Sequence, residues 1–195
     1  MTMTTTTTDA DAAATTSAAP TGTYSLDPTH SRIGFVARHA MVTKVRGSFN
    51  DFTGTGFFDA ADPSKLSMDV TINVTSIDTR NADRDAHLRS NDFFDMATYP
   101  EIRFVSTGVE AVDEANFQVT GDLTIKGVTK PVTIDFEYTG TAMDPFGNRR
   151  IGLEGTVTVN RKDWGISFNA PLETGGVLIS EKVVLEFEVS AIKKA

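Results

Sequence analysis

The chain has 195 residues, a net charge of −8 and no cysteine. That length suits one β-rich domain, and the acidic balance argues against a nucleic-acid partner and against docking on anionic membranes. The composition also excludes disulfides and cysteine-based metal sites, and no apolar run is long enough for stable membrane insertion.

Residues 1–22 consist largely of Thr, Ala and Ser. Because such a segment cannot bury an apolar face, we predict a disordered tail that ends near residue 22. It also lacks the basic start and the continuous apolar stretch of a secretory signal. We therefore expect a cytoplasmic protein, with a periplasmic or secreted location as the alternative.

From residue 23 onward, apolar and polar residues alternate. The stretch LSMDVTINVTSI places Leu66, Met68, Val70 and Ile72 on one face and polar side chains on the other. This period of two is typical of a half-buried antiparallel strand. Similar patterns span residues 31–39, 45–49, 101–109, 116–125, 132–138, 150–160 and 182–191. Turn-forming residues separate several of these segments, as in DAADPSK, KGVTK and DPFGN.

The main helical candidate lies within residues 81–94 and is too short and polar to form a second layer. The sheet must then bury its own apolar face, by closing into a barrel or by folding into a sandwich. Eight long strands with one consistent apolar side favour the barrel. We therefore predict an all-β fold, an eight-stranded antiparallel barrel with one short helix, as a single domain over residues 23–195.

The interior of such a barrel is either filled by side chains or holds one small ligand. Thirteen phenylalanines could fill it. Two features favour a hollow tube: strands of about ten residues imply a height of roughly 25 Å, and Gly108, Gly121 and Gly155 fall on the inward register, where glycine indicates a bend or a close approach. Both alternatives stay open on these grounds.

Chemistry-bearing patterns are sparse. The three histidines, His30, His39 and His87, have no metal-ligand spacing, so we expect no metal site. There is no nucleophile elbow, glycine-rich phosphate loop or acid–base pair, so we assign no catalytic residues and expect no enzyme. The weakest alternative is an enzyme that acts on a bound lipid with His39 or His87 as a base.

Two aromatic clusters lie in predicted connections. Phe93 and Phe94 follow the helical candidate, and Trp164 and Phe168 lie in a second loop. We expect these four to cover one end of the barrel. Polar residues just before the first pair are interpreted either as a solvated helix face or as a rim that meets a ligand head group; the head-group candidates are His30, His39, Arg84 and His87.

Four ordered motifs resemble the YceI family of lipocalin-like, polyisoprenoid-binding proteins. They are YSLDPTHSRIGFVARH with VRGSF, RDAHLRSNDFFDMATYPEIRF, GDLTIKGVTKPV and RKDWGISF. The resemblance runs from about Thr23 to the C-terminus and implies a lipocalin-like lumen that holds a long amphiphile. It also implies isoprenoid transport or storage and a possible homodimer, and it assigns no cofactor and no catalytic residue.

The sequence therefore predicts non-enzymatic binding, carriage or storage of a polyisoprenoid, an isoprenoid quinone or a fatty-acid-like lipid. The alternative is a stress-related structural or protein-interaction module with a filled barrel. Besides the four covering aromatics, the expected lipid-binding residues are Phe35, Val70, Ile72, Phe104, Val119, Leu123, Ile134, Phe136, Leu153, Val157, Leu185 and Phe187.

Overall fold

The computed structural model describes residues 19–173 and 175–195, so the predicted tail up to residue 18 lies outside the described residues. The residues just before the first strand are part of the packed structure. Ala19 is buried in a small apolar cluster with Tyr24 and Ile151. The Tyr24 hydroxyl donates a hydrogen bond to the Pro20 carbonyl at 2.6 Å.

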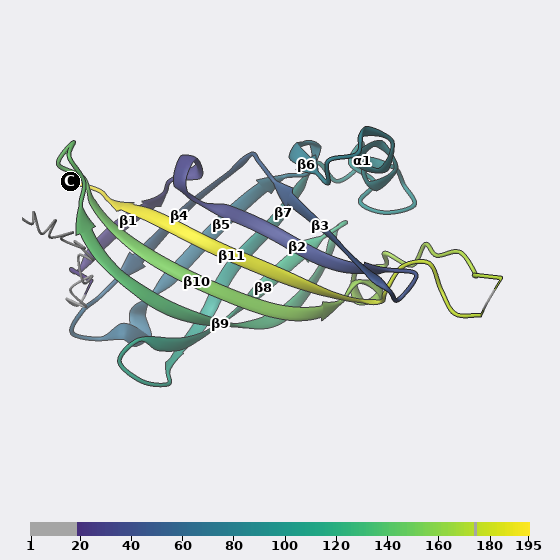
Figure 1. Ribbon diagram of the computed structural model, residues 1–195. Coiled ribbons are helices and arrows are strands. Elements are labelled where there is room, and N and C mark those ends of the chain that lie inside the picture. Colours follow the sequence, from purple (N-terminus) through teal and green to yellow (C-terminus); the bar gives the residue numbers. More distant parts are fainter. Residues whose placement is uncertain (1–18, 174) are drawn as a thin grey trace, which may run out of the picture.

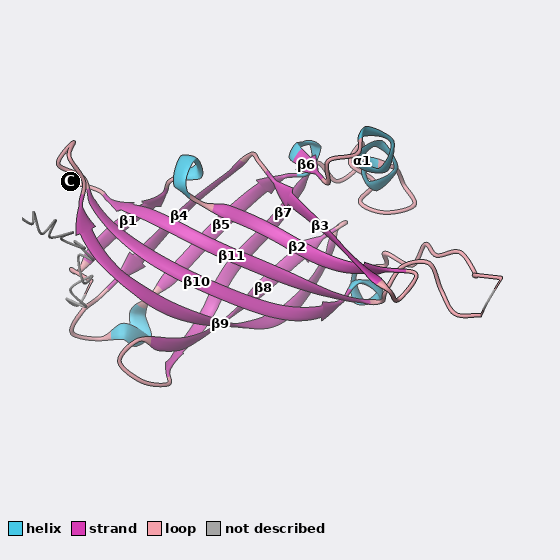
Figure 2. Ribbon diagram, viewed as in Figure 1, coloured by secondary structure: helices cyan, strands magenta, loops and turns pink. Residues whose placement is uncertain are grey.

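The chain folds almost entirely into strands (Figures 1 and 2). The single α-helix of the described residues, α1, spans Ala82–Arg89, and the 3-10 turns are η1 Pro28–His30, η2 Pro63–Lys65, η3 Val74–Ser76 and η4 Arg161–Trp164. The strands are β1 Gly22–Leu26, β2 Arg32–His39, β3 Thr43–Phe49, β4 Phe52–Phe58, β5 Ser67–Asn73, β6 Ile77–Asp78, β7 Glu101–Ala111, β8 Asn116–Ile125, β9 Val128–Met143, β10 Arg149–Asn160 and β11 Lys182–Lys193.

The sheet closes because β1 pairs with both β4 and β11. The first six strands behave as three bent ones. β1 and β2 pair with successive stretches of β11. On their other side, β1 pairs with β4 and β2 pairs with β3. In the same way, β4 pairs with β5 and β3 pairs with β6. Counted this way, eight antiparallel strands lie side by side in chain order, which confirms the predicted eight-stranded barrel.

Local chemistry explains the interruptions. The Asp27 carboxylate accepts a hydrogen bond from the Thr29 amide at 3.0 Å, and Pro28 has no amide to continue the ladder. At the second bend the Asn73 side chain accepts from the Thr75 amide at 3.0 Å. Each short polar side chain thus offers the backbone an alternative to strand pairing.

The predicted helix is confirmed within the expected range. The Asn81 side chain caps it by accepting from the Arg84 amide at 2.9 Å. Figure 1 shows α1 and the long connection from η4 to β11 at one end of the barrel, which we call the helix end; the C-terminus lies at the opposite end. None of the helices in the described part of the chain combines the length and the apolar character needed to cross a bilayer.

Gly121 and Gly155 do not leave room for a guest, contrary to the interpretation from the sequence. A Cβ atom on Gly121 would lie 2.4 Å from the ring of Phe104, and one on Gly155 would lie 2.5 Å from the ring of Phe136. The protein's own aromatic rings therefore take that space. The prediction that Gly108 points inward was wrong: a register shift in the β7–β8 pairing between Ser106 and Gly108 leaves this glycine exposed, with nothing near its Cβ position.

Candidate functional site

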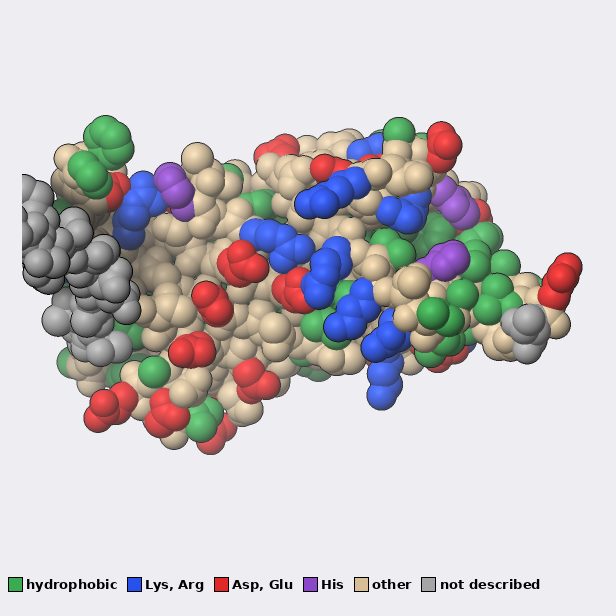
Figure 3. Space-filling model, viewed as in Figure 1, with side chains coloured by type: hydrophobic (Ala, Val, Ile, Leu, Met, Phe, Trp, Pro, Cys, Tyr) green, Lys and Arg blue, Asp and Glu red, His purple; other side chains and the backbone are tan. Residues whose placement is uncertain are grey.

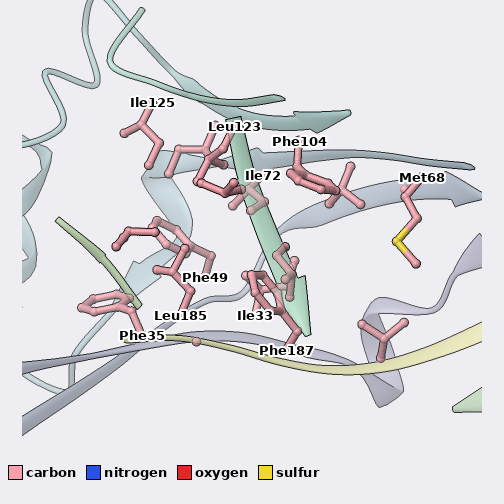
Figure 4. Close-up of a pocket in the computed structure, with 18 of the residues that line it drawn as sticks. Ile33, Phe35, Phe49, Met68, Ile72, Phe104, Leu123, Ile125, Leu185 and Phe187 are labelled. Carbon is pink, nitrogen blue, oxygen red and sulfur yellow. The ribbon is translucent and has the colours of Figure 1, made fainter. Parts of the chain in front are cut away.

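A cavity of about 240 Å³ occupies the lumen, so the barrel is hollow. Figure 4 shows Phe35, Phe104, Leu185 and other apolar side chains pointing into it from strands on opposite sides. Its lining extends from Leu88, which belongs to α1, to residues such as Met68 toward the opposite end. An interior with so few polar groups favours hydrocarbon over water.

The size of the cavity limits what it can hold. An engineered apolar cavity of about 150 Å³ stays dry and binds benzene, whereas pockets for drug-sized ligands start near 300 Å³. The volume found in this lumen, about 240 Å³, lies between these values. Together with the elongated arrangement of the lining, it suits one slender hydrocarbon chain better than a compact, bulky ligand.

Thirteen of the sixteen expected lipid-binding residues line the cavity, and Val119, Val157 and Phe168 do not. Val119 is completely buried, so no free volume reaches its side chain. Val157 packs against the core without bordering the cavity, and the ring of Phe168 lies against Phe93, with 5.3 Å between ring centroids. The residues in the lining are Phe35, Val70, Ile72, Phe93, Phe94, Phe104, Leu123, Ile134, Phe136, Leu153, Trp164, Leu185 and Phe187.

Aromatic side chains from two connections cover the helix end. Phe93 is buried, and Phe94 makes an edge contact with Phe49 at 5.9 Å between ring centroids. Trp164 is also buried, and its indole Nε1–H donates to the Leu123 carbonyl at 3.0 Å. Phe93, Phe94 and Trp164 thus border the cavity itself, while Phe168 packs outside it.

None of the four predicted head-group residues lines the cavity. His30 is exposed and contacts Asp27, and His39 is exposed at the end of β2. Arg84 donates to both the hydroxyl and the carbonyl of Thr79, each at 2.7 Å. Figure 3 shows histidine side chains, in purple, on the molecular surface.

His87 lies closest to the covering aromatics, but on their outer side. Its ring contacts those of Phe93 and Phe168, with centroids 5.0 and 4.9 Å apart. Its Nε2 atom lies 2.8 Å from a carboxylate oxygen of Asp92. The predicted rim therefore lies on the surface and does not face the lumen, and the polar groups of Arg84 and His87 already have partners.

The sequence prediction missed the charged residue that lines the lumen, Arg161. This arginine lines the cavity and is 7% exposed. Its Nε atom donates to the Ser180 carbonyl at 3.0 Å, and Nη1 donates to the Ile166 carbonyl at 2.7 Å. Its Nη2 atom is buried without a hydrogen-bond partner among the described residues. Burial lowers the pKa of Arg161, against the opposing charge of Glu181.

One signal in the sequence points to this arginine. Leu153 and Val159 both point into the lumen from β10, and the same period of two continues to position 161. A charged residue in the apolar phase of a strand is unusual, because burying a charge is costly. The described residues contain no group of three or more His, Cys, Asp or Glu that could hold a metal ion.

Comparisons with known proteins agree with this architecture. A sequence profile described as YceI-like domain matches residues 24–191. A UPF0312 protein of Pseudomonas savastanoi pv. phaseolicola is 42% identical over 142 residues, which cover 73% of this chain and 74% of the relative.

Two solved structures share the fold. A YceI protein of Campylobacter jejuni superposes with a TM-score of 0.71 and 32% identity, covering 81% of this chain and 90% of that one. A polyisoprenoid binding domain from Saccharophagus degradans superposes with a TM-score of 0.65 and 16% identity, covering 88% of this chain and 98% of that one. With a profile match over most of its length, the chain belongs to the family of YceI-like domains.

Proposed function

We propose that this protein binds one long-chain amphiphile in its lumen and carries or stores it without chemical change. The ligand class comprises polyisoprenoids, isoprenoid quinones and fatty-acid-like lipids. The observation that carries the proposal is the hollow, apolar cavity inside the closed barrel. The polyisoprenoid binding domain from Saccharophagus degradans adds support at the level of the shared fold.

The energetics of such a complex are adequate. Each methylene removed from water contributes about 0.8 kcal/mol, so a chain with about fifteen buried carbons gains roughly 12 kcal/mol before costs. Lost translational freedom and the ordering of the chain remove a large share of that gain. A dissociation constant between micromolar and nanomolar is the expected result.

Binding is favoured over catalysis by the positions of the candidate bases. His39 and His87 are exposed and lie outside the cavity lining. A general base has to reach the reacting atom directly or through one water. Neither histidine meets that requirement for a chain inside the lumen. A filled barrel acting only as an interaction module is disfavoured by the cavity itself.

The direct test is to extract lipid from protein purified from its native host and to identify it by mass spectrometry. We expect one single-chain lipid per protein molecule. The delipidated protein should then bind a fluorescent fatty acid saturably, with displacement by added prenyl or acyl chains. Recovery of no lipid, together with no saturable uptake of either class of chain, would exclude the proposed function.

A further inference from the structure

Arg161 is a buried cation for which the described residues supply no carboxylate partner. None of the ion pairs in the described structure includes Arg161. Glu181, the acidic residue whose charge acts on Arg161, is paired with Lys162. Burying an unpaired charge is expensive unless something in its surroundings compensates. The two backbone carbonyls hydrogen-bonded to Arg161 offset part of that cost but carry no net charge.

The guanidinium is also held in a fixed orientation. The carbonyls of Ser180 and Ile166 engage Nε and Nη1, which leaves Nη2 with two unused N–H groups. Arginine presents its five N–H donors in a rigid planar fork that matches carboxylate and phosphate oxygens. Because two edges of the fork are already anchored, an incoming anion would not have to order the side chain first.

The surroundings of Arg161 set the direction of a bound chain. Trp164 and Ile166, which follow Arg161 closely in the sequence, also line the cavity, and both are buried at the helix end. Toward the opposite end the lining includes Tyr24, whose hydroxyl is already bonded to the Pro20 carbonyl. Arg161, with its unused N–H donors, therefore lies at one end of the lumen, and the wall of the lumen from there to the opposite end is apolar.

We infer that Arg161 binds the anionic end group of the lipid, so the preferred ligand is a single hydrocarbon chain that ends in a carboxylate or a phosphate. This inference rests on the proposed function and narrows its ligand class. Fatty acids and prenyl phosphates share the required chemistry, namely anionic oxygens on one slender apolar chain. In this arrangement the ligand's anionic group lies at the helix end, beside Arg161, and its hydrocarbon chain extends toward Met68 and Tyr24.

Two matched ligand pairs test the inference on the delipidated wild-type protein. One pair is a sixteen-carbon fatty acid and its methyl ester, and the other is a prenyl monophosphate and its prenol. Each competes with the same fluorescent probe at neutral pH. We expect the anionic member of at least one pair to bind about 10- to 100-fold more tightly, as for a hydrogen bond to a charged group.

The pair that shows the preference identifies the chemical source of the anion. Equal affinity within both pairs would overturn the inference while leaving lipid binding intact. Absence of binding by all four ligands would instead overturn the proposed function, and this inference with it. The two failures are therefore distinguishable.

The variant Arg161→Met assigns the preference to this side chain. In this variant the anionic ligand should bind no more tightly than its neutral partner. Arg161→Lys, which keeps the charge but not the fork, should retain part of the preference. The matched control is Arg103→Met, since Arg103 is exposed on the barrel exterior and pairs with Asp69 at 2.7 Å.

Circular dichroism and thermal unfolding show whether Arg161→Met stays folded, because the substitution removes two hydrogen bonds to carbonyls. If it does not fold, the wild-type ligand pairs and Arg161→Lys still decide the outcome. An Arg161→Met protein that is folded and keeps the full preference for the anion would overturn the assignment.

Discussion

Strand β10 has an arginine near each end, and the two have opposite surroundings. Arg150 lies near its start and donates through Nε to Asp144 at 2.8 Å and through Nη1 to Asp27 and to Ser190. Arg161 follows its other end and has two carbonyl partners but no carboxylate among the described residues. Hydrogen bonding to Asp27 raises the pKa of Arg150, whereas burial lowers that of Arg161.

The difference separates a structural arginine from one that is available to a ligand. The fold satisfies Arg150 with its own carboxylates and thereby ties the β9–β10 turn to the β1–β2 bend. The fold leaves Arg161 incomplete inside the cavity. A polar residue near a cavity is therefore informative only when its hydrogen-bonding capacity is unmet, which is why the paired Arg84 is a poorer candidate than Arg161.

The largest effect is expected from an arginine introduced into the lumen where neither a carboxylate nor backbone carbonyls are positioned to bind it. Leu185→Arg places a charge on the apolar wall of the lumen, where Leu185 pairs with Val157 and Phe35 across neighbouring strands. A bound hydrocarbon cannot solvate that charge, so affinity should fall at least about 100-fold for acid and ester alike. Competition binding with both ligands measures the change.

The matched control is Thr156→Arg on β10. Thr156 is exposed and stands opposite Glu186 on β11, so the new charge would remain in water. We expect unchanged affinity in this variant, and both variants should keep the circular dichroism spectrum of a β-protein. Full lipid binding by a folded Leu185→Arg protein would contradict a binding site in the lumen.

A smaller effect should come from shortening the lumen opposite Arg161. With the acidic group held at the helix end, affinity should rise about fourfold per methylene until the chain fills the cavity. Met68→Trp adds bulk to the lining on β5, so chains that reach it should lose about tenfold in affinity, equivalent to about two displaced methylenes. A series of fatty acids of increasing length measures where the rise stops.

Short acids should bind Met68→Trp as well as they bind the wild type, because their tails end before residue 68. Thr53→Trp, at an exposed position on neighbouring β4, is the control for adding a tryptophan. An equal loss for short and long acids would show that Met68 does not lie at the tail end. The orientation set by Arg161 would then be reversed or absent.

Much of this architecture could be predicted because it depends on local periodicity. Alternation along each strand assigns one face to the interior, so residues such as Val70, Phe104 and Leu185 could be placed on the cavity wall from sequence alone. The bends were not visible in the alternation. The apolar phase continues from Ile72 to Val74, yet Asn73 turns the chain into η3 at that point.

The rest depends on contacts between distant segments. Whether Gly121 leaves space is decided by the ring of Phe104 on the paired strand, and not by the glycine. Whether Arg161 is satisfied depends on carbonyls at positions 166 and 180, brought together by a connection without periodicity. The head-group residues on α1 were misplaced for the same reason, since Thr79 and Asp92 occupy their polar groups.

The last prediction concerns the satisfied arginine and has the smallest expected effect. Arg150 holds the pKa of Asp27 well below its usual range, and Asn148 together with Arg150 does the same for Asp144. A carboxyl whose folded pKa is depressed stabilises the fold above its unfolded pKa of about 3.9 and loses that contribution as the pH falls toward the folded value. Arg150→Met should therefore lower the thermal midpoint at pH 6, and the gap to the wild type should narrow below about pH 4.

Arg103→Met is the control for this pH dependence. Arg103 also lowers the pKa of its partner, Asp69, but this pair lies on the exposed surface of the barrel. Exposed ion pairs contribute little to stability, so its midpoint should stay close to that of the wild type at every pH. Arg161→Met provides the complementary comparison. Arg161 forms no ion pair in the described structure and is only a minor cause of the lowered pKa of Glu181, whose main partner is Lys162. The effect of this variant on the midpoint of the lipid-free protein should therefore change less with pH than the effect of Arg150→Met. If Arg150→Met and Arg161→Met showed the same pH dependence, the contrast between the paired Arg150 and the unpaired Arg161 would fail, because titrating carboxylates would then have to stabilise both arginines to the same extent.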